Sequence, residues 1–384
     1  MAGQQESRLL VRNRQRVDLV AGCGAGLEVG RQQVVRRGGN TRHHESALAV
    51  FGGLRCYLCL RTMPTCGLRS VGADRATGII VRRLAGRHIS YDADAHSSFA
   101  LATVAACTSR APMTTPVGKR ITLSNGLALS YVDQGDRTAP VLVLLPGLSD
   151  SWRSYELVLP HLPASIRVIA VSLRGHGDSD KPESGYRTKD FSADVADFLS
   201  VLRVTRAIVA GHASASLVAQ RFAIEYPERT AGIVLEGSFA TLRGRKEVVD
   251  RAASAIAPLT DPIGPDFVRK FAAGTIVRPV PQSFMDIMMR ESLKVPARVW
   301  RETFAALVLG DHTSELGDIT APTVLLWGDQ DGLIGREEQD ALTKGIHGSR
   351  LVVYAGVGHS PHWEDPERFA ADLIAFVNSP ELRR

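Results

Sequence analysis

Six short apolar runs recur between segments of helical period in residues 113–384. The runs are Val141–Leu145, Val168–Val171, Ala207–Ala210, Gly232–Leu235, Thr323–Trp327 and Leu351–Tyr354. Continuous apolar runs of this length are typical of strands buried on both faces of a parallel sheet. Helical period is found at Asp190–Leu202, Leu217–Tyr226, Glu337–Gly345 and Pro366–Val377. Repeated strand and helix with short connections predicts an α/β fold with a doubly wound, mostly parallel sheet.

Two more strands are predicted ahead of these runs. Lys119–Ser124 and Leu127–Val132 flank Asn125-Gly126, which is a strong hairpin signal. The sheet is therefore expected to have about eight strands, with flanking helices. Residues from about 240 to 310 break the alternation with six prolines and amphipathic helical patches. We expect this region to form a helical cap over the carboxyl ends of the strands, where such sheets form their sites.

Residues 1–112 differ in composition from the rest of the chain. They contain all five cysteines, sixteen Arg, no Lys and seven acidic residues, so their net charge is +9. The whole chain has a net charge of +6, which leaves about −3 for residues 113–384. The basic pI therefore gives no argument for nucleic-acid binding by the second part. We expect 1–112 to be a largely disordered, Arg-rich extension, with the working start of the protein at Met113.

Sharper interpretations of this extension have weak support. Cys56, Cys59 and Cys66 with His43-His44 could supply zinc ligands, but the second pair lacks the tight spacing of specific zinc motifs. The arginines could bind RNA or anionic lipid, although a solvated tail is the simpler interpretation. No apolar run is long enough to span a membrane, and no credible signal peptide is present. We therefore expect a cytoplasmic protein with no membrane span.

A strand-to-helix bend follows the run Ala207–Ala210. In the pattern Gly-x-Ser-x-Gly, a strained bend exposes a nucleophilic serine above the sheet. Here Gly211 opens the pattern, Ala213 occupies the serine position and Ala215 replaces the second glycine. In that register Ser214 opens the helix, and its backbone N–H would be an oxyanion donor. A bend slipped by one residue would instead place Ser214 at the apex, and this alternative stays open.

Three further loops supply the other groups of such a site. Pro146-Gly147 follows the run Val141–Leu145 and can aim the N–H of Leu148 into the site as the first oxyanion donor. Asp331 and His359 follow the next-to-last and last runs, in the order nucleophile, acid, histidine that this sheet type uses. Asp331 would orient His359, which would act as base and then as acid.

Two rivals for these roles are Asp329 and His362. For Asp329 the simpler interpretation is a solvent-facing structural carboxylate. For His362 it is a contact with the cap.

These features together resemble the α/β-hydrolase family, in the capped single-domain branch that includes small esterases, epoxide hydrolases and haloalkane dehalogenases. The resemblance covers nearly all of 120–380. Its motifs are Pro146-Gly147, Arg174-Gly175-His176-Gly177-Asp178-Ser179, Gly211-His212, Gly328-Asp329-Gln330-Asp331 and Gly358-His359. The family implies a Ser-Asp-His triad, a small-molecule substrate and no cofactor or metal. This chain departs from the family at Ala213 and Ala215.

The alanine at the nucleophile position leaves three interpretations open. The first is a hydrolase for ester-like or other small apolar substrates, acting through Ser214 or through water activated by His359. The second is a catalytically lapsed protein that binds a small ligand in the capped pocket. The third is a deliberate replacement of a serine at Ala213. Phe and Met residues in the expected cap, such as Phe271 and Met288, indicate an adaptable apolar pocket, although most of them should form the cap's own core.

Overall fold

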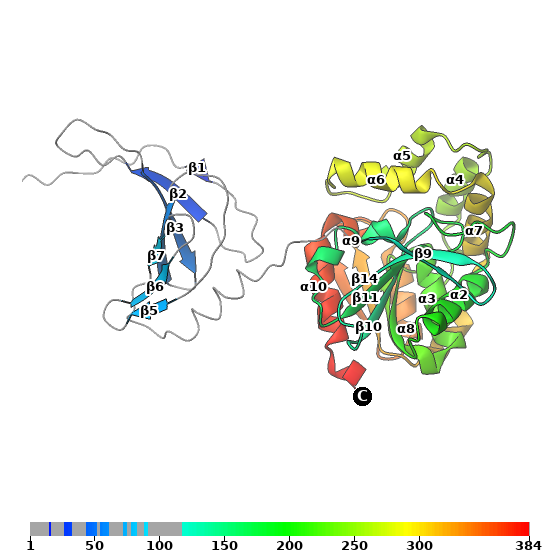
Figure 1. The fold of residues 1–384 in the computed structure, drawn as a ribbon. Coiled ribbons are helices and arrows are strands. Elements are labelled where there is room, and N and C mark those ends of the chain that lie inside the picture. Colours follow the sequence, from blue (N-terminus) through cyan, green and yellow to red (C-terminus); the bar gives the residue numbers. More distant parts are fainter. Residues whose placement is uncertain are drawn as a thin grey trace, which may run out of the picture. The chain divides into compact units, whose positions relative to one another are not determined.

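The computed structural model describes residues 117–383 and seven strands within the first 112 residues. The chain divides into two compact units, Met1–Pro112 and Met113–Arg384. Figure 1 shows the ribbon of both units.

The first unit contains one antiparallel sheet, with strand order β1-β2-β3-β4-β7-β6-β5. Its strands are β1 (Gln15–Arg16), β2 (Leu27–Gln32), β3 (His44–Phe51), β4 (Leu54–Leu60), β5 (Gly72–Asp74), β6 (Gly78–Arg82) and β7 (His88–Ser90). The sequence pattern did not predict these strands. Three expectations concern parts of the chain that the structure does not describe. They are the disorder of the residues between these strands, the start at Met113 and the possible zinc ligands.

The second unit is built on an eight-stranded sheet with the order β15-β14-β13-β12-β10-β11-β9-β8. Its strands are β8 (Lys119–Thr122), β9 (Ala128–Gln134), β10 (Val141–Leu145), β11 (Arg167–Val171), β12 (Ala207–His212), β13 (Thr230–Glu236), β14 (Thr323–Gly328) and β15 (Arg350–Tyr354). Pairing is parallel from β11 to β15, and antiparallel for β8 with β9 and β9 with β11. The predicted α/β sheet of about eight strands is confirmed.

The hairpin between β8 and β9 forms at the predicted Asn125-Gly126. The N–H of Gly126 donates to the carbonyl of Leu123 at 3.0 Å, and the N–H of Leu123 donates to the carbonyl of Leu127 at 2.8 Å. Gly126 has φ of 87°, a left-handed conformation that glycine adopts without a steric penalty. The hairpin lies at one edge of the sheet, with β8 as the outermost strand.

Helices cover both faces of the sheet (Figure 1). The helices are α2 (Thr188–Val201), α3 (Ser214–Glu225), α8 (Arg336–Gly345), α9 (Pro361–Glu364) and α10 (Pro366–Val377), with short 3-10 turns η1 (Trp152–Tyr155), η2 (Leu159–His161), η3 (Pro227–Arg229), η4 (Thr313–Asp318) and η5 (Pro380–Arg383). Neighbouring residues of β10 enter different cores: Val143 belongs to the buried cluster that contains Phe198 and Phe222, whereas Leu144 belongs to the cluster that contains Phe369. Burial on both faces explains why the strand is apolar throughout.

Four helices between β13 and β14 lie beyond the carboxyl ends of the strands (Figure 1). These cap helices are α4 (Lys246–Ile256), α5 (Pro265–Ala273), α6 (Gln282–Ser292) and α7 (Ala297–Leu309). Trp300 of α7 is fully buried and meets Phe267 and Phe271 of α5 edge-on, with ring centroids 5.1 and 4.9 Å apart. Part of the aromatic content of this segment therefore holds its helices together.

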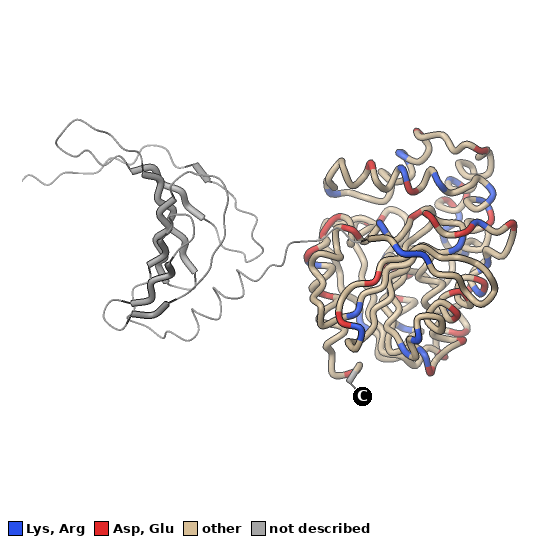
Figure 2. Tube along the Cα trace, in the orientation of Figure 1, with Lys and Arg blue, Asp and Glu red and all other residues tan. Residues whose placement is uncertain are grey.

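Charged residues of both signs are interspersed along the second unit (Figure 2). This mixture fits the small negative charge computed from the sequence. Among the described residues, no helix has the length and apolar character needed to cross a membrane.

Candidate active site

The bend between β12 and α3 has its apex at Ala213. This residue has φ of 49° and ψ of −117°, a conformation that non-glycine residues rarely adopt. Its N–H donates to the carbonyl oxygen of Glu236 at the end of β13, at 2.9 Å, which holds the bend against the neighbouring strand. Ser214 begins the helix. The strained position is therefore Ala213, and the structure does not have the slipped bend that would place Ser214 at the apex.

Gly211 permits the close passage of strand and helix at this bend. A Cβ atom on Gly211 would overlap the carbonyl oxygen of Ala215 and lie 2.6 Å from its carbonyl carbon. Ala215, in contrast, is buried with its methyl group accommodated in the core. The first glycine of the pattern is thus required here, and the second is replaceable by a small residue.

Asp331 and His359 form a buried hydrogen-bonded pair. The Nδ1 of His359 lies 2.7 Å from Oδ2 of Asp331. The other carboxylate oxygen of Asp331 accepts the backbone N–H groups of Leu333 and Ile334 at 2.8 and 3.0 Å. The rival carboxylate, Asp329, is exposed and accepts the N–H of Gly356. Asp331 is therefore the carboxylate that orients His359.

The pair shifts the pKa of each partner toward its charged form. Burial alone would raise the pKa of Asp331, but His359 and the two backbone N–H groups outweigh burial and lower it. Burial alone would lower the pKa of His359, but the Asp331 carboxylate outweighs burial and raises it. The imidazole can consequently take up a proton more readily than an isolated buried histidine.

This electrostatic coupling predicts the effect of Asp331→Asn. The amide removes the negative charge, so we expect the pKa of His359 to fall below its wild-type value, because the strongest influence that opposes burial is lost. The titration of the His359 ring by NMR measures this shift. Asp329→Asn is the matched control, since Asp329 bonds Gly356 instead of the imidazole. An unchanged His359 titration in Asp331→Asn would contradict the pairing.

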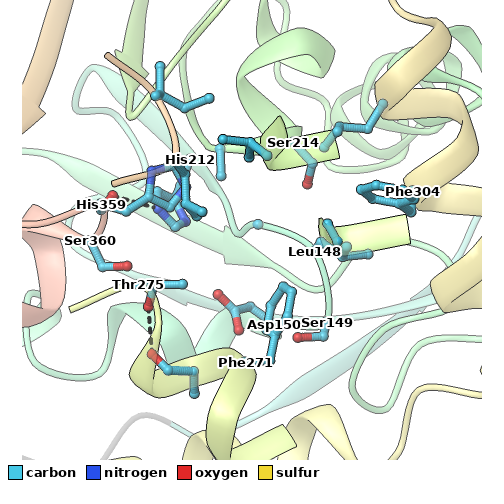
Figure 3. A pocket seen from close by; sticks show the side chains of 18 of the residues that line it. Leu148, Ser149, Asp150, His212, Ser214, Phe271, Thr275, Phe304, His359 and Ser360 are labelled. Atoms are coloured by element: carbon cyan, nitrogen blue, oxygen red, sulfur yellow. Dashed lines mark hydrogen bonds between the residues drawn. The ribbon is translucent and has the colours of Figure 1, made fainter. Parts of the chain in front are cut away.

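A cavity of about 140 Å³ lies between His359, the bend and the cap helices (Figure 3). Leu148, Ala213, Ser214 and His359 line it. The apolar residues of its cap side are Val248, Val249, Ala252, Ile256, Phe271, Ala272, Phe304 and Leu307. Within residues 117–383, no group accepts a hydrogen bond from the backbone N–H of Leu148 or of Ser214. Both predicted oxyanion donors therefore remain available at the cavity.

A second buried polar cluster lies beside the bend, and sequence reasoning missed most of it. Nδ1 of His362 lies 2.7 Å from Oε1 of Glu236, and Nε2 of His362 lies 2.9 Å from Oγ of Ser154. His362 is fully buried, and the two side chains that it bonds belong to β13 and η1. Burial raises the pKa of Glu236 to about 7, whereas burial lowers the pKa of His362. A charged residue ending an otherwise apolar strand was the available signal for Glu236.

This cluster also contains the ring of His212, the residue before the apex. Possible ligand atoms of His212, Glu236 and His362 lie within 4.8 Å of one another. His362 bonds Glu236 and Ser154, and Nε2 of His212 lies 3.1 Å from the carbonyl oxygen of His359. We interpret the cluster as a hydrogen-bonded support for the bend.

The connection between α5 and α6 is bonded to the His359 loop. The N–H of His359 donates to the carbonyl of Thr275 at 2.9 Å. The carboxylate of Glu364 accepts the N–H groups of Val277 and Arg278 on the cap side, and the N–H of Gly358 on the histidine side. One carboxylate thus joins one edge of the cap to the loop that carries the imidazole.

Comparison with known proteins places this arrangement in a family. The model of the alpha/beta hydrolase family matches residues 142–372. A putative 2-succinyl-6-hydroxy-2,4-cyclohexadiene-1-carboxylate synthase of Bacillus subtilis is 26% identical over 67% of this chain and 98% of its own length. Mouse epoxide hydrolase 4 is 26% identical over 68% of this chain and 79% of its own length.

Solved structures give the same result. An esterase from Rhodococcus sp. ECU1013 is 29% identical, with a TM-score of 0.61 over 68% of this chain and 98% of that chain. An esterase from Exiguobacterium antarcticum shares the fold at 22% identity, with a TM-score of 0.63 over 68% of this chain and all of that chain. With the family model covering more than half of its length, the chain belongs to the alpha/beta hydrolase family.

Proposed function

We propose that this protein is a slow hydrolase of small, largely apolar esters, in which a water molecule activated by His359 replaces the serine nucleophile. One observation carries the proposal: His359, which is paired with Asp331, lines the same cavity as the strained Ala213 and the two free N–H donors. Similarity to the Rhodococcus esterase supports ester-like substrates. We place its action in the cytoplasm, because residues 113–384 contain no cysteine and need no oxidising compartment.

The reaction uses water beside the Ala213 methyl group. Nε2 of His359 has no hydrogen-bond partner within residues 117–383, so it is free to take a proton from that water. The water oxygen then bonds to the ester carbonyl carbon, and the N–H groups of Leu148 and Ser214 stabilise the oxyanion. When the ester C–O bond breaks, the protonated imidazole returns the proton to the leaving alkoxide.

Hydrolysis of a short-chain nitrophenyl ester by the full chain tests this proposal. We expect His359→Gln to lower kcat/KM by about a hundredfold, because the general base is lost. Ser214→Ala should change kcat/KM by less than about threefold, because its contribution is the backbone N–H. Loss of activity in Ser214→Ala with retention in His359→Gln would exclude activated water and favour Ser214 as the nucleophile.

A second candidate function is binding of a small ligand without turnover. The observation that favours it is the alanine at the apex above an intact apolar cavity. In that case no variant with Ala213 in place hydrolyses the ester, and a bound ligand raises Tm. Measuring Tm and turnover with the same compounds separates the two functions.

A further inference from the structure

Asp150 is a buried carboxyl group that the proposed reaction does not use. Its side chain is turned toward the cavity (Figure 3), and the residue is only 6% exposed. Oδ2 accepts one long hydrogen bond from Oγ of Ser154, at 3.3 Å. Among residues 117–383, none donates a hydrogen bond to Oδ1. A carboxylate normally accepts several hydrogen bonds when it is buried, so this environment is poor for the ionised form.

The charged groups around Asp150 do not supply that stabilisation. His359 attracts the charged form from the loop after β15, and Glu236 repels it from the end of β13. Within the described residues, neither Lys nor Arg lines the cavity. Burial is the dominant effect and raises the pKa of Asp150 to about 8, against the smaller lowering effects of Ser154 and His359. A proton on the carboxyl group then makes it a hydrogen-bond donor.

We propose that Asp150 is protonated in the resting protein and donates a hydrogen bond to a neutral oxygen acceptor on the substrate, such as a carbonyl or ether oxygen. The substrate class is thus an apolar body carrying one acceptor beyond the scissile ester. The absence of Lys and Arg from the described cavity lining disfavours anionic substrates. This inference rests on the proposed function, because the ligand of Asp150 is a substrate only if the protein is a hydrolase. The hydrogen bond from Asp150 can be measured without turnover.

Acetophenone and ethylbenzene are matched probes, because they differ mainly in one carbonyl oxygen. A cavity of about 140 Å³ suits a single ring, since an engineered apolar cavity of about 150 Å³ admits benzene. We expect the wild-type protein to bind acetophenone about three- to tenfold more tightly than ethylbenzene at about pH 6. The preference should disappear at about pH 9.5, where the carboxyl group is ionised. Calorimetry or the fluorescence of Trp363, which lines the cavity, reports binding.

Two variants identify the donor. Asp150→Asn keeps a neutral donor, so its preference for acetophenone should be present at both pH values. Asp150→Leu has no donor and should bind the two probes equally. A preference that persists in Asp150→Leu would assign the hydrogen bond to the N–H groups of Leu148 and Ser214 and overturn the proposal. The same pH dependence in Asp150→Asn would assign it to His359 and would also overturn it.

The pH dependence of urea unfolding gives a second test of whether Asp150 is protonated, and it needs no ligand. The folded-state pKa of Asp150, about 8, lies above the ordinary aspartate value of 3.8. The stability that Asp150 contributes is therefore full below about pH 4 and is lost as the pH rises through about 8. Relative to wild type, Asp150→Asn should gain stability between about pH 5 and about pH 9. A constant difference in urea midpoint over that range would contradict a protonated Asp150.

These outcomes separate the two proposals. Binding that follows Asp150, without ester turnover in any variant, would reject the hydrolase and retain the hydrogen bond. Turnover that depends on His359, with no probe preference at either pH, would reject the hydrogen bond and retain the hydrolase.

Discussion

Ala213→Ser should raise the kcat/KM for ester hydrolysis by about a thousandfold or more. Serine enzymes of this kind lose most of their rate when the nucleophile is removed, and retain only what the oxyanion donors and binding supply. Here the apex conformation, the hydrogen bond from Ala213 to Glu236, and the pair of Asp331 and His359 are all present without the hydroxyl. The substitution adds one oxygen atom at a backbone position that already has the required geometry.

The matched experiment places a second serine at a neighbouring small residue. Ala215→Ser adds the same hydroxyl two residues along, inside the core packed by α3, and should not raise turnover. A covalent adduct of Ala213→Ser with a fluorophosphonate, detected by mass, would show that the new hydroxyl is activated. If Ala213→Ser remains as slow as wild type and forms no adduct, the site lacks more than a nucleophile, and the binding function is favoured.

Gly211→Ala should lower the free energy of unfolding by about 3 kcal/mol or more. Its new methyl group would overlap the carbonyl oxygen of Ala215, which belongs to the first turn of α3. Backbone atoms cannot move aside as a flexible side chain can, so either the strand or the helix must shift. Because the same bend carries Ala213, we expect ester turnover and ligand binding to fall together with stability.

Gly244→Ala is the control for this substitution. A Cβ atom at Gly244 meets no atom within 4 Å, and its backbone does not require a positive φ. We expect its unfolding free energy to stay within about 0.5 kcal/mol of wild type. Urea unfolding of both variants measures the difference. Equal stability of the two would mean that strand and helix separate easily at the bend.

The fold of the second unit was predictable from the sequence because its strands are buried on both faces. A short, wholly apolar run such as Val141–Leu145 predicts a strand whose two faces are both covered by helices. The structure has a strand over those five residues. The strands of the first unit carry no comparable pattern. Leu54–Leu60, for example, includes Arg55 and two cysteines among its apolar residues, so the alternation that would predict a strand is weak.

The candidate site was predictable where chain order determines it, and not where tertiary packing does. Asp331 and His359 follow β14 and β15, which are neighbouring parallel strands. The carboxyl ends of these two strands lie at the same edge of the sheet, which brings the two side chains together. Glu236 and Ser154 meet His362 only because β13, η1 and α9 converge beside the bend. No sequence spacing gives that convergence. The protonation of Asp150 likewise depends on burial, which the motif does not reveal.

The carboxylate of Glu364 has a consequence for how ligands come and go. It bonds Val277 and Arg278 of the cap on one side and Gly358 of the histidine loop on the other. A ligand that enters by lifting this edge of the cap must either break the hydrogen bonds of Glu364 to Val277 and Arg278 or carry the histidine loop with it. The strength of one carboxylate's hydrogen bonds therefore bears on both ligand entry and the position of the imidazole.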